Sequence, residues 1–411
     1  MTGFVPGDRV VCRGGVASLQ GTYITRRDGM AVVKLDNGYN IGVEFGDCTL
    51  LERQEPLNAP SVSIEQDESL PLLSIVSTGG TIASRIDYRS GAVTTQFDAA
   101  DIIRAIPGLQ EIGCFRTRVL AGILSENMTP PLWQEMARAI YGEIRGGAQG
   151  VIVTHGTDTM AYSSAAVSFM LDSPVPVVFV GSQRSADRPS SDNVMNALCS
   201  ASAAVSRLGE VVVIMHDTES DDRCAIHRGT RVRKMHTSRR DAFRSLDPGP
   251  IGYVDYPSLE VTLSRDAILR NEREPVLRDS MEERCGLVTF YPGMPASAIE
   301  QFAGWKGLVI AGTGLGHVST SLIPAIRDLI DQGTLVVMTS QCLHGRVCDR
   351  VYDTGRDLLR IGVVEGEDML PETALVKLMW VLGNEPDPEK ARELMRGELK
   401  GECSGRSAHG L

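Results

Sequence analysis

Two turns in the sequence carry hydroxyl groups that could take part in nucleophilic chemistry. The first lies in residues 77–83, STGGTIA, where Gly79 and Gly80 precede Thr81. A Gly-Gly turn lets backbone N–H groups approach a bound group and leaves the threonine hydroxyl accessible. An isolated turn of this kind is more often a plain strand-to-helix connection in which the threonine caps the helix. The segment contains neither GxGxxG nor GKS or GKT, so it does not predict a phosphate-binding loop.

The second turn lies in residues 154–160, THGTDTM, and supplies Gly156, Thr157 and Asp158. If both turns end strands of one parallel sheet, they meet at its carboxyl edge, where such sheets bind ligands. We therefore expect two hydroxyls and one carboxylate to lie where a single ligand could touch all three.

A basic group is also needed, because a threonine hydroxyl is a poor nucleophile until a neighbour takes its proton. Lys234 is the only lysine between Lys34 and Lys306, and it stands in an arginine-rich run, residues 228–244. The alternative interpretation makes Lys234 one more surface cation and the whole run a solvated basic face.

The elements that must position these residues read as an α/β fold. Short apolar runs rich in β-branched residues, each followed by a helix-like stretch, are typical of strands buried on both faces of a parallel sheet. One set precedes a polar stretch at residues 264–284 and another follows it. The runs are 72–76, 151–153, 177–180 and 211–215, then 286–290, 308–311 and 335–338. We predict two α/β domains with the site in the first.

The amino-terminal part differs from the rest. Short alternating strands with an Asp-Asn-Gly step at residues 36–38 predict a hairpin within a small SH3-like β-barrel. The predicted domains are a barrel at 1–52, a linker at 53–70, the first α/β domain at 71–265, a connection at 266–284, the second α/β domain at 285–395 and a tail at 396–411.

Composition limits the class of protein. The 411 residues are 42% hydrophobic and 23% charged, which is typical of a folded globular chain. No leader-like start and no apolar run of ~20 residues is found, so we expect neither export nor a membrane. Nine scattered cysteines without CxxC pairs indicate reduced thiols and a cytoplasmic location. The net charge of −11 argues against this chain alone gripping a nucleic-acid backbone.

TGGTIA followed by HGTDTM resembles the paired signatures of the bacterial-type asparaginase and glutaminase family, and the resemblance spans about residues 72–385. It implies an asparaginase-like fold of two α/β domains and an amidohydrolase. It further implies that Thr81 is the nucleophile, and that Thr157, Asp158 and Lys234 form a connected set that activates the second half of the reaction. The resemblance implies no metal and no organic cofactor in this chain.

The same resemblance assigns substrate contacts. Ser125 and Glu126 fall where the family holds the α-carboxylate and α-amino group of its amino-acid substrate, with Gly80 and Gly156 beside them. The alternative for Glu126 is an N-cap or first-turn acid before a helix that begins near Pro130. Family members also carry a tyrosine in the loop after the nucleophile, and here only Tyr88 is available, closer to Thr81 than the pattern predicts.

Two further features could suggest chemistry. His155 could look like a general base, although a histidine at a strand end is more often a structural hydrogen-bonding group. Cys342, His344 and Cys348 could suggest a metal, but their spacing matches no common zinc motif.

Within the family, the barrel and three segments resemble the D subunits of archaeal glutamyl-tRNA(Gln) amidotransferases. The segments are residues 231–245, 340–347 and 366–383. This resemblance implies that glutamine is hydrolysed at Thr81 and that the ammonia passes to a partner E subunit. That subunit, with ATP and Mg²⁺, would activate and amidate Glu-tRNA(Gln) and bind most of the tRNA. It implies a heterotetramer around a homodimer core.

Two alternatives remain open. One is a free-standing cytoplasmic asparaginase or glutaminase, which needs no barrel. The other is a binding scaffold that has kept the fold without catalysis, although the intact set of Thr81, Thr157, Asp158 and Lys234 argues against it.

Overall fold

The computed structural model describes residues 4–5, 7–14, 17–27, 29–36, 39–53, 66–79, 85–86, 93–94, 106, 108–185, 188 and 190–405. Its amino-terminal part is a five-stranded antiparallel sheet in the order β4-β3-β2-β1-β5. The strands are β1 (Arg9–Gly14), β2 (Ala17–Arg27), β3 (Met30–Leu35), β4 (Asn40–Glu44) and β5 (Cys48–Glu52). β3 and β4 pair antiparallel as the predicted hairpin requires, and Asn37 and Gly38 lie outside the described residues. β5 was not predicted, because only its first residue, Cys48, is buried.

The next part of the chain, here called the N-terminal lobe, contains an eight-stranded sheet in the order β18-β17-β14-β13-β12-β10-β6-β9. Five neighbouring strands are parallel: β6 (Leu72–Gly79), β9 (Cys114–Ile123), β10 (Gly150–Thr154), β12 (Val177–Val180) and β13 (Val211–His216). β10, β12 and β13 are buried along their whole length, as their apolar runs predict. Three antiparallel strands extend the sheet beyond the prediction: β14 (Arg223–Arg228), β17 (Gly252–Asp255) and β18 (Val261–Leu263).

Helices cover this sheet. They are α2 (Pro130–Arg145), α3 (Met160–Met170) and α4 (Asn193–Val205). Ten of the eleven residues of α3 are buried, so this helix is enclosed rather than amphipathic. Two small ribbons stand apart from the sheet: β7 (Arg85–Ile86) with β8 (Val93–Thr94), and β15 (Val232–Lys234) with β16 (Phe243–Ser245).

The C-terminal lobe has a four-stranded parallel sheet in the order β20-β21-β22-β23. Its strands are β20 (Cys285–Thr289), β21 (Gly307–Gly312), β22 (Leu335–Ser340) and β23 (Val364–Glu365). Its helices are α5 (Ser297–Glu300), α6 (Ile323–Asp331), α7 (Asp353–Arg360), α8 (Pro371–Asn384) and α9 (Pro388–Arg396). The two-domain α/β prediction is therefore confirmed.

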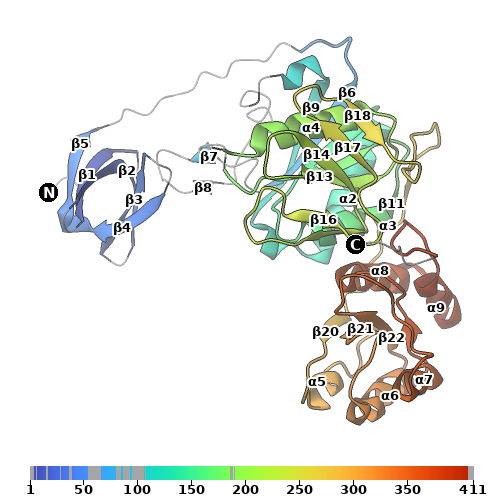
Figure 1. The fold of residues 1–411 in the computed structure, drawn as a ribbon. Helices are drawn as coiled ribbons and strands as arrows, with labels where there is room; N and C mark the ends of the chain where they lie inside the picture. Colours follow the sequence, from blue (N-terminus) through green and yellow to red (C-terminus); the bar gives the residue numbers. More distant parts are fainter. Residues whose placement is uncertain are drawn as a thin grey trace.

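The two lobes meet at α8, which contacts both α3 and β21 (Figure 1). Phe169 of α3 and Trp380 of α8 stack with ring centroids 6.1 Å apart. A short ribbon of β11 (Leu171–Asp172) and β19 (Val276–Leu277) ties the connecting segment to the N-terminal lobe. The contact between α3 and α8 is thus an apolar part of the junction.

Short 3₁₀ turns complete the described elements, at Phe45–Asp47, Leu109–Glu111, Ser125–Asn127 and Thr320–Leu322. All nine cysteines are free, as their spacing predicts. Among the described residues, no helix is long and apolar enough to cross a membrane.

Candidate active site

The turn that follows β10 lies at the carboxyl edge of the large sheet. Thr154 ends the strand, and residues 155–159 lead into α3. His155 is fully buried and shares a 2.7 Å hydrogen bond between its Nδ1 and the Gly156 carbonyl oxygen, so it has the structural role that we expected. Burial lowers the pKa of His155 to about 4, which keeps the ring neutral.

Lys234, at the end of β15, reaches this turn from a separate ribbon. Its Nζ donates to Thr157 Oγ1 and to Asp158 Oδ1, each at 2.8 Å. The Lys234 side chain is 14% exposed, whereas that of Asp158 is 67% exposed. Because Thr157 Oγ1 accepts from the lysine, its own hydrogen is left to donate to another acceptor. The lysine, more than 70 positions away in the chain, thus joins the turn in one connected polar group.

Close backbone approach places Ser125 against the same turn. A Cβ added to Gly156 would lie 2.7 Å from the Cβ of Ser125, so only glycine fits here. The hydroxyl of Thr159 donates to the Ser125 carbonyl oxygen at 2.7 Å. The predicted substrate contacts Ser125 and Gly156 are therefore neighbours, and Ser125 is buried between β9 and the turn.

Glu126 lies next to Ser125 in the 3₁₀ turn Ser125–Asn127, and its side chain is exposed. Helix α2 begins at Pro130 with Thr129 at its N-cap. The alternative that made Glu126 an N-cap or first-turn acid of this helix is thus wrong. Its carboxylate instead stands free of the helix at the edge that carries Ser125.

The strand before the first hydroxyl-bearing turn is also held at this edge. β6 ends at Gly79, whose φ of +107° is open to glycine alone, and an added Cβ would lie 2.6 Å from the Ile123 carbonyl oxygen. Gly80, Thr81 and Tyr88 lie outside the described residues.

Asp192 organises a further turn, and we did not predict it. It is fully buried and accepts hydrogen bonds from the hydroxyl of Ser182 and from the backbone N–H groups of Gln183 and Arg184. A Cβ added to Gly181, which opens this turn, would lie 2.9 Å from Thr157 Cγ2. The sequence signal for it is an aspartate directly before α4, a position where caps are common.

The arginine-rich run is only in part a solvated basic face: the side chains of Arg228, Arg231 and Arg240 are at most 12% exposed, whereas those of Arg233, Arg239 and Arg244 are 37–45% exposed. Each of the six arginines in residues 228–244 forms an ion pair with an acid, and Arg231 is only 2% exposed. The acids are Glu210, Asp368, Glu372, Asp241 and Asp221. The charges of these six arginines are therefore paired within the chain, and few of them are left to bind phosphate groups.

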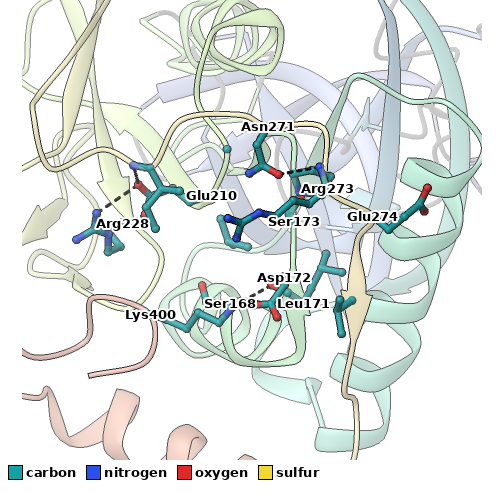
Figure 2. Close-up of a pocket in the computed structure, with 15 residues that line it drawn as sticks. Ser168, Leu171, Asp172, Ser173, Glu210, Arg228, Asn271, Arg273, Glu274 and Lys400 are labelled. Atoms are coloured by element: carbon teal, nitrogen blue, oxygen red, sulfur yellow. Dashed lines mark hydrogen bonds and ion pairs between the residues drawn. The ribbon is translucent and has the colours of Figure 1, made fainter. Parts of the chain in front are cut away.

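A cavity of ≈ 370 Å³ opens at the opposite edge of the sheet, where β13 begins. Figure 2 shows the side chains that line it. Its wall includes Glu210, just before β13, and its charged groups are largely paired with one another. Arg228 Nε lies 2.7 Å from Glu210 Oε2, and Lys400 pairs with Asp172. The cavity is thus separate from the turn that carries Thr157.

No group of three or more metal-ligating side chains gathers within the part of the chain that the structure describes. His344 pairs through Nδ1 with Asp247 Oδ1 of the N-terminal lobe at 3.1 Å. The histidine of the weak Cys-His pattern therefore contacts the other lobe.

Three protein-family models match the chain. Residues 4–50 match the GatD N-terminal domain, residues 72–267 match the N-terminal asparaginase domain, and residues 284–395 match the glutaminase/asparaginase C-terminal domain.

Whole-chain comparisons agree with these matches. The D subunit of the glutamyl-tRNA(Gln) amidotransferase of Methanosarcina mazei is 53% identical over 418 residues, covering 98% of each chain. Its counterpart in Halobacterium salinarum is 53% identical over 414 residues, covering 96% of this chain and 97% of the relative. Among solved structures, the thermostable L-asparaginase from Thermococcus kodakarensis superposes with a TM-score of 0.74 at 32% identity, over 82% of this chain and all of that one.

Proposed function

This chain belongs to the family of glutamyl-tRNA(Gln) amidotransferase D subunits, and from that premise we propose that it is the glutaminase subunit of such an enzyme. It hydrolyses glutamine to glutamate and ammonia, and the ammonia converts Glu-tRNA(Gln) to Gln-tRNA(Gln). The observation that carries this proposal is the match along the whole chain, which includes the amino-terminal domain as well as both asparaginase-like lobes.

Thr81 is the nucleophile in this proposal. Its Oγ attacks the side-chain carbonyl carbon of glutamine, the C–N bond breaks, and the threonine proton leaves with the nitrogen as ammonia. An ester links the glutamyl group to Thr81 until water hydrolyses it to glutamate and restores the hydroxyl.

Lys234, Thr157 and Asp158 serve the hydrolysis of this ester. The support is the pair of 2.8 Å hydrogen bonds from Lys234 Nζ, which orient the Thr157 hydroxyl at the carboxyl edge of the sheet. Because these hydrogen bonds already fix the orientation of the groups, less entropy is lost when the transition state forms.

The substrate's backbone groups are held by Ser125 and Glu126, with Gly80 and Gly156 alongside. Glu126 offers an exposed carboxylate to the α-ammonium group, and Ser125 lies directly against Gly156. Because it is charged, a carboxylate binds an ammonium group more strongly than an uncharged amide side chain at the same position would.

An E subunit is the proposed partner, in a heterotetramer built on a homodimer of this chain. The E subunit holds ATP and Mg²⁺ and most of the tRNA, and this chain needs no cofactor of its own. The support is the net charge of −11 together with the internal pairing of the arginines in residues 228–244.

The test uses the full chain assembled with its partner subunit and charged tRNA. Thr81→Ala and Lys234→Ala should each abolish formation of Gln-tRNA(Gln) from glutamine, yet leave formation from added ammonium chloride intact. Lys306→Ala, which removes an exposed lysine of the C-terminal lobe, is the matched control.

The chain alone should show little glutaminase activity, and this activity should rise when the partner subunit and charged tRNA are added. Fast hydrolysis of glutamine by the chain alone, or full activity of Thr81→Ala, would contradict the proposal. Assays with asparagine beside glutamine separate it from a free-standing asparaginase.

A further inference from the structure

The last described segment, residues 397–405, connects the two lobes close to Lys234, and we call it the C-terminal strap. Its Lys400 carbonyl oxygen accepts from Thr230 Oγ1 at 2.9 Å, and its Gly401 carbonyl oxygen accepts from Arg231 Nε at 2.8 Å. Both donors lie just before β15. Ser404 in turn donates its backbone N–H to Asp368 Oδ1 of the C-terminal lobe at 2.9 Å.

A buried ion pair fixes the shape of the strap. Lys377 Nζ lies 2.6 Å from Glu402 Oε1, and both side chains are fully buried. Glu402 also accepts from the backbone N–H groups of Leu399 and Lys400. Because desolvation makes buried ion pairs poor sources of stability, a fully hydrogen-bonded pair of this kind chiefly selects one conformation.

Arg231 is the point where the strap, the C-terminal lobe and β15 meet. Its guanidinium group donates to Asp368 Oδ2 from Nη1 and from Nη2, each at 3.2 Å. Its side chain is 2% exposed and that of Asp368 is 1% exposed. The planar guanidinium group has several fixed donors, so it can bind the carboxylate and the Gly401 carbonyl oxygen at once.

The residues before Lys234 are held alternately on two sides. Val232, 1% exposed, belongs to the N-terminal lobe's core, and Lys234 reaches Thr157 in the same lobe. Arg231 and Arg233 turn the other way, and Arg233 Nε lies 3.3 Å from Glu372 Oε1 of α8. Val232, Arg233 and Lys234 alternate as in an extended strand, and Arg231, in the turn directly before it, fixes where that strand begins.

We infer that Arg231 is a positioning residue for Lys234: the strap and Asp368 fix its guanidinium group, and the strand that begins at the next residue carries Lys234 to Thr157 and Asp158. The inference rests on the proposed role of Lys234 in glutamine hydrolysis. A long lysine side chain is flexible, and a displacement of about 1 Å at a catalytic group can cost about 100-fold in rate. The same contacts make the site depend on how the two lobes are joined.

The experiment compares Arg231→Met, Arg231→Lys and Asp368→Asn in the assembled amidotransferase. Arg231→Met should lower the glutaminase kcat at least tenfold while KM changes less than twofold, and hydroxamate formed from glutamine and hydroxylamine should fall in proportion. Arg231→Lys, which restores the charge but not the planar fork, should give an intermediate kcat. Asp368→Asn keeps the side-chain shape and should lower kcat in the same direction, so the test survives if Arg231→Met does not fold.

Glu143→Gln is the matched control, because it neutralises a buried carboxylate that pairs with Arg116, far in sequence from β15. It should lower the unfolding temperature without lowering kcat, and amidation from ammonium chloride should be unchanged in every variant. A folded Arg231→Met protein with kcat within twofold of the wild-type value overturns the inference, as does an equal loss in Glu143→Gln. If Lys234→Ala itself stays active, the proposed mechanism fails instead, so the two failures are distinguishable.

Discussion

The hydroxyl of Thr78 donates to the Thr154 carbonyl oxygen at 3.0 Å, which ties β6 to β10 just before both strands leave the sheet. The Thr154 hydroxyl completes the link by donating to Ser77 Oγ at 3.0 Å. The two hydroxyl-bearing turns of the sequence therefore start from strand ends that are joined by side chains as well as by the backbone ladder.

Replacing Thr78 with valine should weaken this link. The substitution keeps the side-chain shape but removes a buried donor, so the unfolding free energy should fall by about 1–2 kcal/mol and the glutaminase kcat should fall with it. Urea denaturation and the ammonia-release assay would measure both effects. Thr262→Val on the exposed edge strand β18 is the control and should change neither. A Thr78→Val protein with wild-type kcat would show that the link is not needed for activity.

Gly156→Ala should weaken substrate binding. The added Cβ would lie 2.7 Å from the Cβ of Ser125 and 2.8 Å from its Oγ, so the turn or Ser125 must move. We expect KM for glutamine to rise at least tenfold in steady-state assays. Gly249→Ala, whose Cβ would meet no atom within 4 Å, should leave KM unchanged. An unchanged KM in Gly156→Ala would mean that Ser125 does not contact substrate.

Two buried histidines should make the protein acid-sensitive. Burial lowers the pKa of His155 to about 4, and burial together with the positive charge of Arg244 lowers the pKa of His227 to about 3. A depressed histidine pKa leaves stability complete above pH 6.5 and removes it as the pH falls toward the folded-state pKa. Each histidine should contribute ~1.4 kcal/mol of unfolding free energy per pH unit in that window.

Denaturation curves from pH 7 to pH 4.5 would test this pH dependence. His155→Asn, which keeps a donor for the Gly156 carbonyl oxygen, should flatten the slope by the share of one histidine. Thr262→Val, which changes an exposed group that does not titrate, should leave the slope as in the wild type. The same slope in all three proteins would contradict the assignment.

Ionisation of Asp349 should make the protein less stable as the pH rises, which is opposite to the effect of the two histidines. Burial, and then the negative charge of Glu365, raise the pKa of Asp349 to about 7, and neither of its carboxylate oxygens has a hydrogen-bond partner in the described structure. A raised carboxyl pKa means that stability is complete below the ordinary pKa near 3.8 and is lost as the pH rises toward 7. Asp349→Asn should therefore stabilise the chain at pH 8, by roughly 2–4 kcal/mol.

The comparison needs two pH values and one control. At pH 5 the stabilisation by Asp349→Asn should shrink to about a third of its value at pH 8, because the loss of stability runs from pH 3.8 to about pH 7 and only its first part has then occurred. Asp353→Asn changes a side chain that is 91% exposed and should have little effect at either pH. Equal stabilisation by Asp349→Asn at pH 5 and pH 8 would show that ionisation is not the cause.

The large parallel strands could be predicted because residues buried on both faces leave a direct apolar signature, as in Val177–Val180. β14, β17 and β18 could not, because short antiparallel strands owe their pairing to tertiary context rather than to their own sequence. β14 even places a charged residue at each end, Arg223 and Arg228.

The candidate site was likewise predicted only in part. The motifs singled out Thr157, Asp158 and Lys234, and the structure brings these three together, while their catalytic roles remain our proposal. The pairing of the arginines escaped prediction because most of their acids are distant in sequence; Asp368, for example, lies 137 positions after Arg231. Glu126 was ambiguous because a helix start predicted to within a few residues cannot separate it from the true N-cap, Thr129.

Lys234 sits on a two-stranded ribbon that shares no strand with the eight-stranded sheet. Ribbons of this size have little stability of their own and open in local fluctuations that leave the main sheet folded. We therefore expect amide hydrogens of β15 and β16 to exchange faster than those of β10 and β12. Low concentrations of denaturant should then inactivate the enzyme reversibly, while its circular dichroism is still that of the native fold.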